Sequence, residues 1–303
     1  MKRRFSAWVA LPLALSPALL APVAQADTGQ LARIVVPTEQ DRSLDIIARL
    51  LQPHLAKQFG RPVGVDNRPD KDGFAAVEFA AKPPSNEQLV LVGALHNLIV
   101  IPIRRGLSFD VLDKFRPVAL IGKLRGALLI RQKRGISEFS DVVSYVKTNE
   151  QRIRYGLSEG INPSNLVMLA IVKRNGLDME CLQYPGSIEM ADALVKGRID
   201  MMFGYGAAVS RAMENGNVRE VQNPLAETTL WVGVLVPRDT SEAVVGQVRQ
   251  GVIDALHDNA VAKKLRSMHL ELEQDPSPAA FSSFLKTERE RWGDIVREAG
   301  VTK

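Results

Sequence analysis

The sequence has 303 residues, of which 46% are hydrophobic and 24% are charged, and its formal net charge is +5. This composition is typical of a globular protein with one large domain or two modest ones, and it excludes a disordered chain, a collagen-like repeat and a polytopic membrane protein. The single cysteine cannot form an internal disulfide, and the four histidines are too scattered to form a metal site. We therefore expect neither a metal nor a cofactor.

The first 26 residues have the three parts of an export signal. Residues 2–4 are cationic, residues 5–20 are almost wholly apolar, and residues 24–26 read Ala-Gln-Ala, the small-residue pattern that signal peptidases cleave. The apolar run is too short and too rich in proline for a membrane anchor. We expect cleavage after Ala26 and release into the periplasm. Without residues 2–4 the net charge falls to +2, so nucleic-acid binding is not expected.

Strand-like apolar runs alternate with amphipathic helix-like segments along the rest of the chain. This order predicts an α/β fold with mixed, mostly parallel sheets flanked by helices. Cys181 lies in one of the apolar runs and is expected to be buried. The predicted strands are 34–36, 63–65, 89–93, 118–121, 127–130, 153–156, 179–182, 199–203 and 231–236, and the predicted helices are 43–55, 74–81, 139–146, 166–173, 189–196, 243–257, 260–268 and 278–299.

The strand pattern predicts two lobes. Strands at 118–121 and 127–130 are split by residues 122–126, which we interpret as a crossing between lobes. The pattern then restarts as a shorter unit, and the strand at 231–236 is long enough to carry the chain back. We expect a discontinuous lobe 1 and an inserted lobe 2, with a ligand cleft between them. The expected boundaries are 27–121 plus 231–303 for lobe 1 and 122–230 for lobe 2.

Several short stretches occur in an order and spacing that make chance similarity to a known family improbable. They are residues 34–37 followed by 45–51, residues 60–63 with 67–69, and residues 115–121, 184–187, 197–203 and 291–301. Together they resemble the substrate receptors of tripartite tricarboxylate transporters, the Bug family of periplasmic binding proteins. The resemblance implies a two-lobed Venus-flytrap fold of the type II class. It also implies a receptor for small, usually carboxylated metabolites, without enzyme activity.

The turn after the first strand departs from this family. The family usually has a Pro-Gly-Gly turn there, whereas residues 38–42 read Thr-Glu-Gln-Asp-Arg. Side chains bar close approach of the backbone, and two carboxylates repel an anion by about 1 kcal/mol each. Two hypotheses stay open. Either Glu39, Asp41 or Glu159 meets an amine while Arg42 holds a carboxylate, or these charges are solvated and the pocket binds weakly.

Loops that leave strands and lead into helices are the expected ligand site, because their backbone N–H groups and helix dipoles favour anions. Arg42 is the expected carboxylate partner, so we expect Arg42→Ala to abolish binding of an acidic ligand. The predicted ligand-binding residues are Thr38, Arg42, Ser43, Asp45, His96, Asn97, Ser158, Asn162, Ser164, Tyr184, Ser187 and Tyr205.

One motif favours a different class of protein. Residues 156–160 match the G-x-S-x-G nucleophile elbow of serine hydrolases, with His257 and His269 downstream. Both histidines lie in predicted helical surroundings, however, and Pro163 interrupts the helix that should follow the elbow at once. We interpret the motif as a polar turn of a ligand pocket, with a hydrolase using Ser158 as an alternative.

The leading hypothesis is a monomeric periplasmic receptor that closes its lobes around a small-molecule ligand. Its expected partners are the membrane permease subunits of a tripartite tricarboxylate-type transporter. A second hypothesis keeps the fold but replaces transport with signalling to the periplasmic domain of a sensor kinase. The altered first turn favours this second hypothesis mildly.

Overall fold

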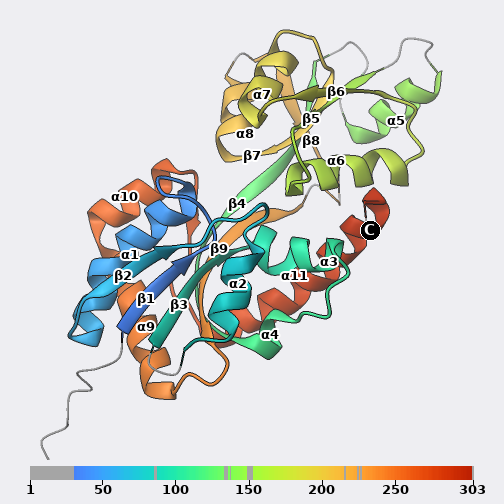
Figure 1. Cartoon of the computed structure of the whole chain (residues 1–303). Coiled ribbons are helices and arrows are strands. Elements are labelled where there is room, and N and C mark those ends of the chain that lie inside the picture. The colour runs from blue at the N-terminus through green and yellow to red at the C-terminus, as the bar shows by residue number, and fades with distance from the viewer. Residues whose placement is uncertain are drawn as a thin grey trace, which may run out of the picture.

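The computed structural model describes residues 31–84, 87–132, 136, 138–148, 153–214, 216–223, 225 and 227–301. The predicted signal at 1–26 lies outside the described residues. Figure 1 shows two bodies of strands and helices joined by the long strand β4 (Phe115–Arg131). We call the body that holds the N-terminal strands lobe 1 and the other body lobe 2. Among the described residues, no helix is both long and apolar enough to cross a bilayer.

The sheet of lobe 1 contains three adjacent parallel strands, and further strands join it through antiparallel pairs. β1 (Leu31–Val36) lies between β2 (Val63–Asn67) and β3 (Glu87–Ala94), and the three are parallel. β9 (Thr229–Pro237) pairs antiparallel with β3 on one side and with β4 on the other. The carboxyl ends of β1, β2 and β3 therefore open onto one edge of the sheet, the edge at which open α/β sheets bind ligands.

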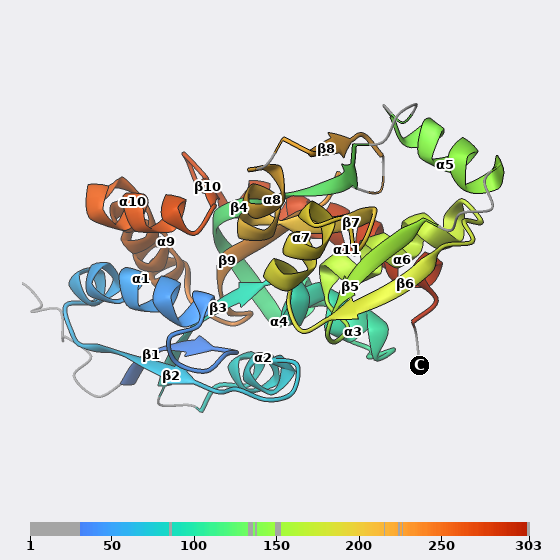
Figure 2. The ribbon, with the colours of Figure 1, turned by 90° about the horizontal axis from the view of Figure 1, so that it is seen from above.

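Helices cover both faces of this sheet. Alternate residues of β1 belong to different cores, because successive side chains of a strand point to opposite faces. This double burial explains why β3, for example, is an almost continuous apolar run in the sequence. Figure 2 shows α1, α9 and α10 gathered beside one another, away from α2. Their bounds are α1 (Ser43–Phe59), α9 (Glu242–His257), α10 (Asn259–Ser267) and α2 (Phe74–Ala81).

The crossing strand β4 is one continuous element of 17 residues, whereas the sequence predicted two strands split by residues 122–126. Its first part pairs with β9, and its last part pairs with β7 (Met201–Tyr205). A Cβ on Gly122 would lie 2.7 Å from the carbonyl oxygen of Glu271, in the short strand β10 (Glu271–Leu272). The glycines that suggested a break therefore permit close approach of neighbouring strands.

Lobe 2 repeats the pattern of strands and helices on a smaller scale. β5 (Arg154–Ser158) is parallel to β6 (Glu180–Tyr184) and to β7. β6 is at the edge of the sheet and its side chains are largely exposed. Cys181 is exposed on β6, so the prediction that it is buried was wrong. The remaining elements are β8 (Val218–Val221), α5 (Phe139–Thr148), α6 (Pro163–Arg174), α7 (Ser187–Val195) and α8 (Gly206–Met213).

The last helix, α11 (Pro278–Ala299), contacts both lobes. It packs on β4 and on α6, and Figure 1 shows its C-terminal end below α6. Nζ of Lys173 in α6 donates a hydrogen bond to the carbonyl oxygen of Ala299 at 2.7 Å. One hydrophobic core cluster accordingly contains residues of both lobes. The boundaries expected from the sequence stay a prediction, and the C-terminal helix is shared between the two bodies.

Candidate ligand-binding cleft

A cavity of about 710 Å³ lies between the two lobes. On the lobe 1 side it is lined by the turn after β2 and by the segment after β3, and on the lobe 2 side by the loop between β5 and α6. These segments follow the carboxyl ends of strands, the usual place for ligands in such sheets. The lining residues are Asp70, Lys71, Asp72, His96, Ile101, Arg104, Arg105, Glu159, Gly160, Ile161, Asn162 and Pro163.

The turn after β2 carries Asp72 to the cavity. The next residue, Gly73, has φ +75° and precedes α2. A Cβ on Gly73 would lie 3.0 Å from the carbonyl oxygen of Pro37, so the approach of this turn to the end of β1 requires glycine. The carboxylate oxygens of Asp72 lie 3.7 Å from Nη2 of Arg104 and 3.8 Å from Nη1 of Arg105. These ion pairs are too long to be hydrogen bonds.

Two short helical turns, the π-helix η1 (His96–Val100) and α3 (Ile101–Arg104), follow β3. Asn97 fixes the first of them, because its side-chain oxygen accepts the backbone N–H of Ala94 at 2.9 Å. The sequence predicted neither a helix nor a strand in this segment. A π-helix widens the backbone locally and is frequent at functional sites. Here the two turns bring the first residue of η1 and the last residue of α3 to the same wall of the cavity.

His96 and Arg104 each carry a buried polar atom that is left unpaired by the described part of the chain. Nδ1 of His96 and Nε of Arg104 have no hydrogen-bond partner among the residues that the structure describes. Burial lowers the pKa of His96; the carboxylate of Asp72 opposes this effect and the guanidinium of Arg104 adds to it. The imidazole is therefore neutral at neutral pH. A buried polar group without a hydrogen bond costs about 1–3 kcal/mol of stability. Binding of a ligand that hydrogen-bonds to these atoms is therefore favoured.

The loop after β5 is held by two asparagine side chains. Oδ1 of Asn162 accepts the N–H of Asn165 at 3.1 Å and so caps α6, while Nδ2 of Asn162 donates to Oγ of Ser158 at 2.9 Å. Nδ2 of Asn165 donates to the carbonyl oxygens of Ser158 and Gly160, each at 2.6 Å. Glu159 is exposed beside this network, and its carboxylate makes no ion pair with the described residues. The lobe 2 wall is therefore held by several hydrogen bonds, and it carries a negative charge that is available to a ligand.

Two of the residues predicted to bind ligand, His96 and Asn162, line the cavity. Ser158 does not line the cavity, and among the described contacts its hydroxyl is hydrogen-bonded to the side chains of Asn162 and Asn165 rather than to a histidine. These contacts do not form the nucleophile–base pair that a serine hydrolase needs. The other predicted residues do not line this cavity; they are Thr38, Arg42, Ser43, Asp45, Asn97, Ser164, Tyr184, Ser187 and Tyr205.

The side chain of Asp45 stabilises the turn after β1 and is not available to a ligand. Asp45 is fully buried and accepts hydrogen bonds from Nε of Arg49 at 2.9 Å, Nδ2 of Asn67 at 2.9 Å and the backbone N–H of Asp41 at 3.0 Å. Burial alone would raise the pKa of Asp45, but these hydrogen bonds and the charge of Arg49 lower it below its ordinary value. Arg42 lies on the exposed side of the same turn, just before α1.

Tyr205, the aromatic residue expected against the ligand, is buried inside lobe 2. Its hydroxyl lies 2.7 Å from Oγ1 of Thr228, and its ring packs edge-on against Phe203 with 5.1 Å between centroids. Burial raises the pKa of Tyr205. Its packing is that of a core residue at the end of β7.

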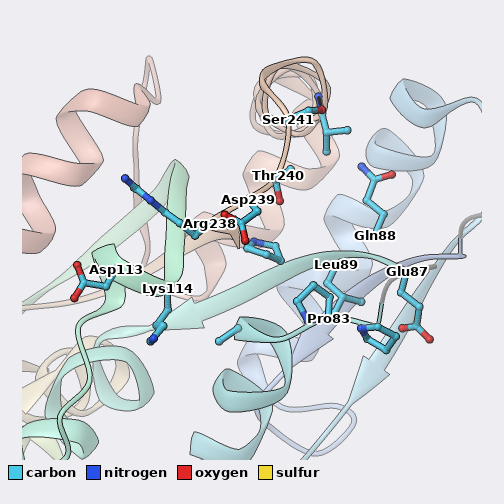
Figure 3. A pocket seen from close by; sticks show the side chains of 14 residues that line it. Pro83, Glu87, Gln88, Leu89, Asp113, Lys114, Arg238, Asp239, Thr240 and Ser241 are labelled. Atoms are coloured by element: carbon cyan, nitrogen blue, oxygen red, sulfur yellow. Dashed lines mark hydrogen bonds between the residues drawn. The ribbon is translucent and has the colours of Figure 1, made fainter.

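A second cavity, of about 540 Å³, is lined by lobe 1 alone. Figure 3 shows Glu87 and Gln88 on one side of it and Asp113 and Lys114 on the other. Glu87 begins β3, whereas the interlobe cavity lies past the other end of the same strand. The second cavity is thus at the amino edge of the parallel strands, away from the edge where open sheets bind ligands.

Sequence reasoning missed the charged wall formed by Lys71, Asp72, Arg104 and Arg105. No ligand-binding role was predicted for residues 70–73, and no helix or strand was predicted at 94–105. One signal was available: His96 and Arg104 are eight residues apart, which is close to two turns of a helix. A helix expected after β3 would have placed both on one side.

A polar cavity between two α/β lobes is characteristic of bilobal solute-binding proteins. The TctC sequence profile, described as "Tripartite tricarboxylate transporter family receptor", matches residues 47–224. That match covers more than half of the chain, so the chain belongs to the TctC (Bug) receptor family. The resemblance found in the sequence is confirmed.

Relatives and solved structures are similar over nearly the whole chain. A UPF0065 protein of Bordetella pertussis is 25% identical over 93% of this chain and 94% of its own length. A ligand-free TctC solute-binding protein from Polaromonas superimposes with a TM-score of 0.73 at 16% identity, over 89% of this chain and 99% of that one. MatC from Rhodopseudomonas palustris with bound malate has a TM-score of 0.63 at 22% identity, over 88% and 99%. These structures confirm the two-lobed periplasmic-binding-protein fold.

Proposed function

We propose that this protein is a periplasmic receptor that captures a small organic metabolite, a carboxylate or an amino acid, between its lobes. The observation that carries the proposal is the interlobe cavity, in which His96 and Arg104 present buried polar atoms without partners among the described residues. Membership of the TctC family supports a receptor, and the malate held by MatC supports a carboxylate group in the ligand. A ligand that contacts both walls stabilises the closed arrangement of the lobes.

A thermal-shift screen of the purified protein tests this proposal. The panel contains dicarboxylates such as malate and adipate, aromatic acids, and the twenty L-amino acids. A ligand at 100 times its dissociation constant should raise the free energy of unfolding by about 2.7 kcal/mol, because it binds only the native state. A panel in which no compound shifts the transition at millimolar concentration would contradict the proposal.

The proposed partners are the membrane permease subunits of a tripartite tricarboxylate-type transporter. Uptake of the radiolabelled ligand should fall in a strain that lacks the gene and recover when the gene is restored. Unchanged uptake, together with loss of ligand-induced gene expression, would favour the sensor-kinase hypothesis instead.

We also propose export through the signal at residues 1–26. Mass spectrometry of the periplasmic fraction should find a chain that begins at Asp27. A chain that retains the first 26 residues would contradict cleavage after Ala26.

A further inference from the structure

The charges of the interlobe cavity are divided between its two walls. Lobe 1 contributes three cationic and two anionic side chains, an excess of one positive charge. Lobe 2 contributes one charged side chain, the carboxylate of Glu159. The neutral imidazole of His96 adds a polar group to the positive wall without adding charge. A small ligand in this cavity therefore meets opposite charges on opposite walls.

The positive wall has hydrogen-bond donors that are available to a ligand. Asp72 lies 3.7 Å from Arg104 and 3.8 Å from Arg105, so it partly balances their charge but leaves their N–H groups available. Nε of Arg104 and Nδ1 of His96 are buried without partners among the described residues. A planar carboxylate suits such a pair of donors, because a guanidinium and an imidazole N–H can each donate to one of its oxygens.

The negative wall offers the complementary group. Glu159 follows β5 and is exposed, and Asn162 and Asn165 hold the loop around it in one conformation. Its carboxylate pairs with no cation among the residues that the structure describes. A ligand anion would be repelled here, whereas an ammonium group would be attracted.

We propose that the cleft selects a zwitterionic amino acid, with its carboxylate on Arg104 and His96 of lobe 1 and its ammonium on Glu159 of lobe 2. This inference rests on the proposed function of the cleft as a ligand site. Each end of the ligand is held by a different lobe, so binding draws the lobes together. Ile101 and Ile161 line the same cavity and provide apolar contact for an aliphatic side chain. A dicarboxylate would place its second anion against Glu159.

Matched ligands test the two charged ends. The L-amino acid with the largest thermal shift is titrated by calorimetry beside its deamino analogue and its decarboxylated amine. For leucine these are 4-methylpentanoate and 3-methylbutylamine. We expect each analogue to bind at least tenfold more weakly than the amino acid, because each lacks one of the two charge contacts. An analogue that binds as tightly as the amino acid would overturn the assignment of the end that it lacks.

Two variants separate the two walls. Arg104→Gln should lower the affinity for the amino acid and for the deamino acid alike, by at least tenfold. Glu159→Gln should weaken binding of the amino acid. It should leave the affinity for the deamino acid unchanged or increase it, since it removes a repulsive charge. Arg238→Gln in lobe 1 and Glu214→Gln in lobe 2, both exposed and outside this cavity, are the matched controls. Circular dichroism and the unfolding temperature without ligand establish that each variant is folded.

The outcomes distinguish this inference from the proposed function. If malate or another acid without an amine binds and no amino acid does, the receptor function stands and the zwitterion assignment is overturned. If an amino acid binds and neither Arg104→Gln nor Glu159→Gln weakens it, the residue assignment is overturned. If nothing in the panel binds, both proposals fail.

Discussion

Glu288 is a fully buried carboxyl that joins α11 to β9. Its Oε2 accepts the indole N–H of Trp231 at 3.0 Å and that of Trp292 at 3.2 Å, and Nη1 of Arg291 lies 3.3 Å from its Oε1. Both indole N–H groups depend on this one oxygen, because they have no other hydrogen-bond partner among the described contacts. A polar side chain in the core is thus explained by the two tryptophans that it satisfies.

We predict that Glu288→Leu lowers the free energy of unfolding by about 3 kcal/mol, because it leaves two buried indole donors unpartnered. Glu288→Gln retains an oxygen acceptor of similar shape and should cost markedly less. Urea denaturation followed by far-UV circular dichroism measures both losses. Equal losses for the two variants would show that the hydrogen bonds to the indoles are not what stabilises this position.

Glu288 also predicts a pH dependence of stability. Burial raises the pKa of Glu288 above its ordinary value of 4.5, against the charge of Arg291 and the two indole N–H groups. Between the ordinary pKa of the unfolded state and the raised pKa of the folded state, the folded protein binds more protons than the unfolded protein. The contribution of Glu288 to stability is therefore fully present below pH 4.5 and is lost as the pH rises through the raised pKa. The unfolding free energy of the wild type minus that of Glu288→Gln should therefore decrease from pH 4 to pH 7. A difference that is constant or increases would contradict this assignment.

At the scale of elements, hydrophobic periodicity predicted most helices and strands well. The segment 74–81 is found as α2 and the segment 278–299 as α11, because each has a buried apolar side and a clear beginning. The charged wall of the cleft was not predictable in the same way. It depends on η1 and α3, which place His96 and Arg104 on the same wall of the cavity, and a π-helix has no periodicity that the sequence reveals.

The crossing strand β4 was predicted as two strands, because its glycines were interpreted as a break. Gly126 lies where β4 passes from β9 to β7. A Cβ there would clash with the ring of Phe203 and lie 2.8 Å from Cε1 of Tyr205 and 3.0 Å from the carbonyl oxygen of Thr228. Glycine is therefore required by packing rather than by a turn.

We predict that Gly126→Ala lowers the free energy of unfolding by about 2 kcal/mol, the usual cost of forcing extra volume into a packed core. Gly246→Ala is the matched control, because Gly246 is exposed on α9 and its added methyl would meet nothing within 4 Å. The control should be stabilised by up to about 1 kcal/mol, since alanine is the better helix former. Thermal and urea unfolding of both variants measure the contrast. A Gly126→Ala protein as stable as the wild type would mean that the surrounding rings adjust without cost.

At the scale of the whole molecule, α6 links the cleft to the joint between the lobes. Its first turn is capped by Asn162 at the cavity, and Lys173 near its other end donates to the carbonyl oxygen of Ala299 in α11. A rotation of lobe 2 that closes the cleft therefore has to carry α6 along while keeping its contact with α11. The lobes are bodies that share a core, rather than independent domains on a flexible linker.

This shared core predicts that the two lobes unfold together. One hydrophobic cluster includes Phe115 from lobe 1, Ile171 from α6 and Trp292 from α11, so neither lobe can lose its structure without exposing apolar surface of the other. Of the three tryptophans, one is at position 8 in the predicted signal, and the other two are the partners of Glu288 at this joint. Tryptophan fluorescence thus reports on the joint, while far-UV circular dichroism reports on the helices of both lobes. We expect the two signals to follow a single urea transition with one midpoint, and two separated midpoints would show that the lobes are stabilised independently.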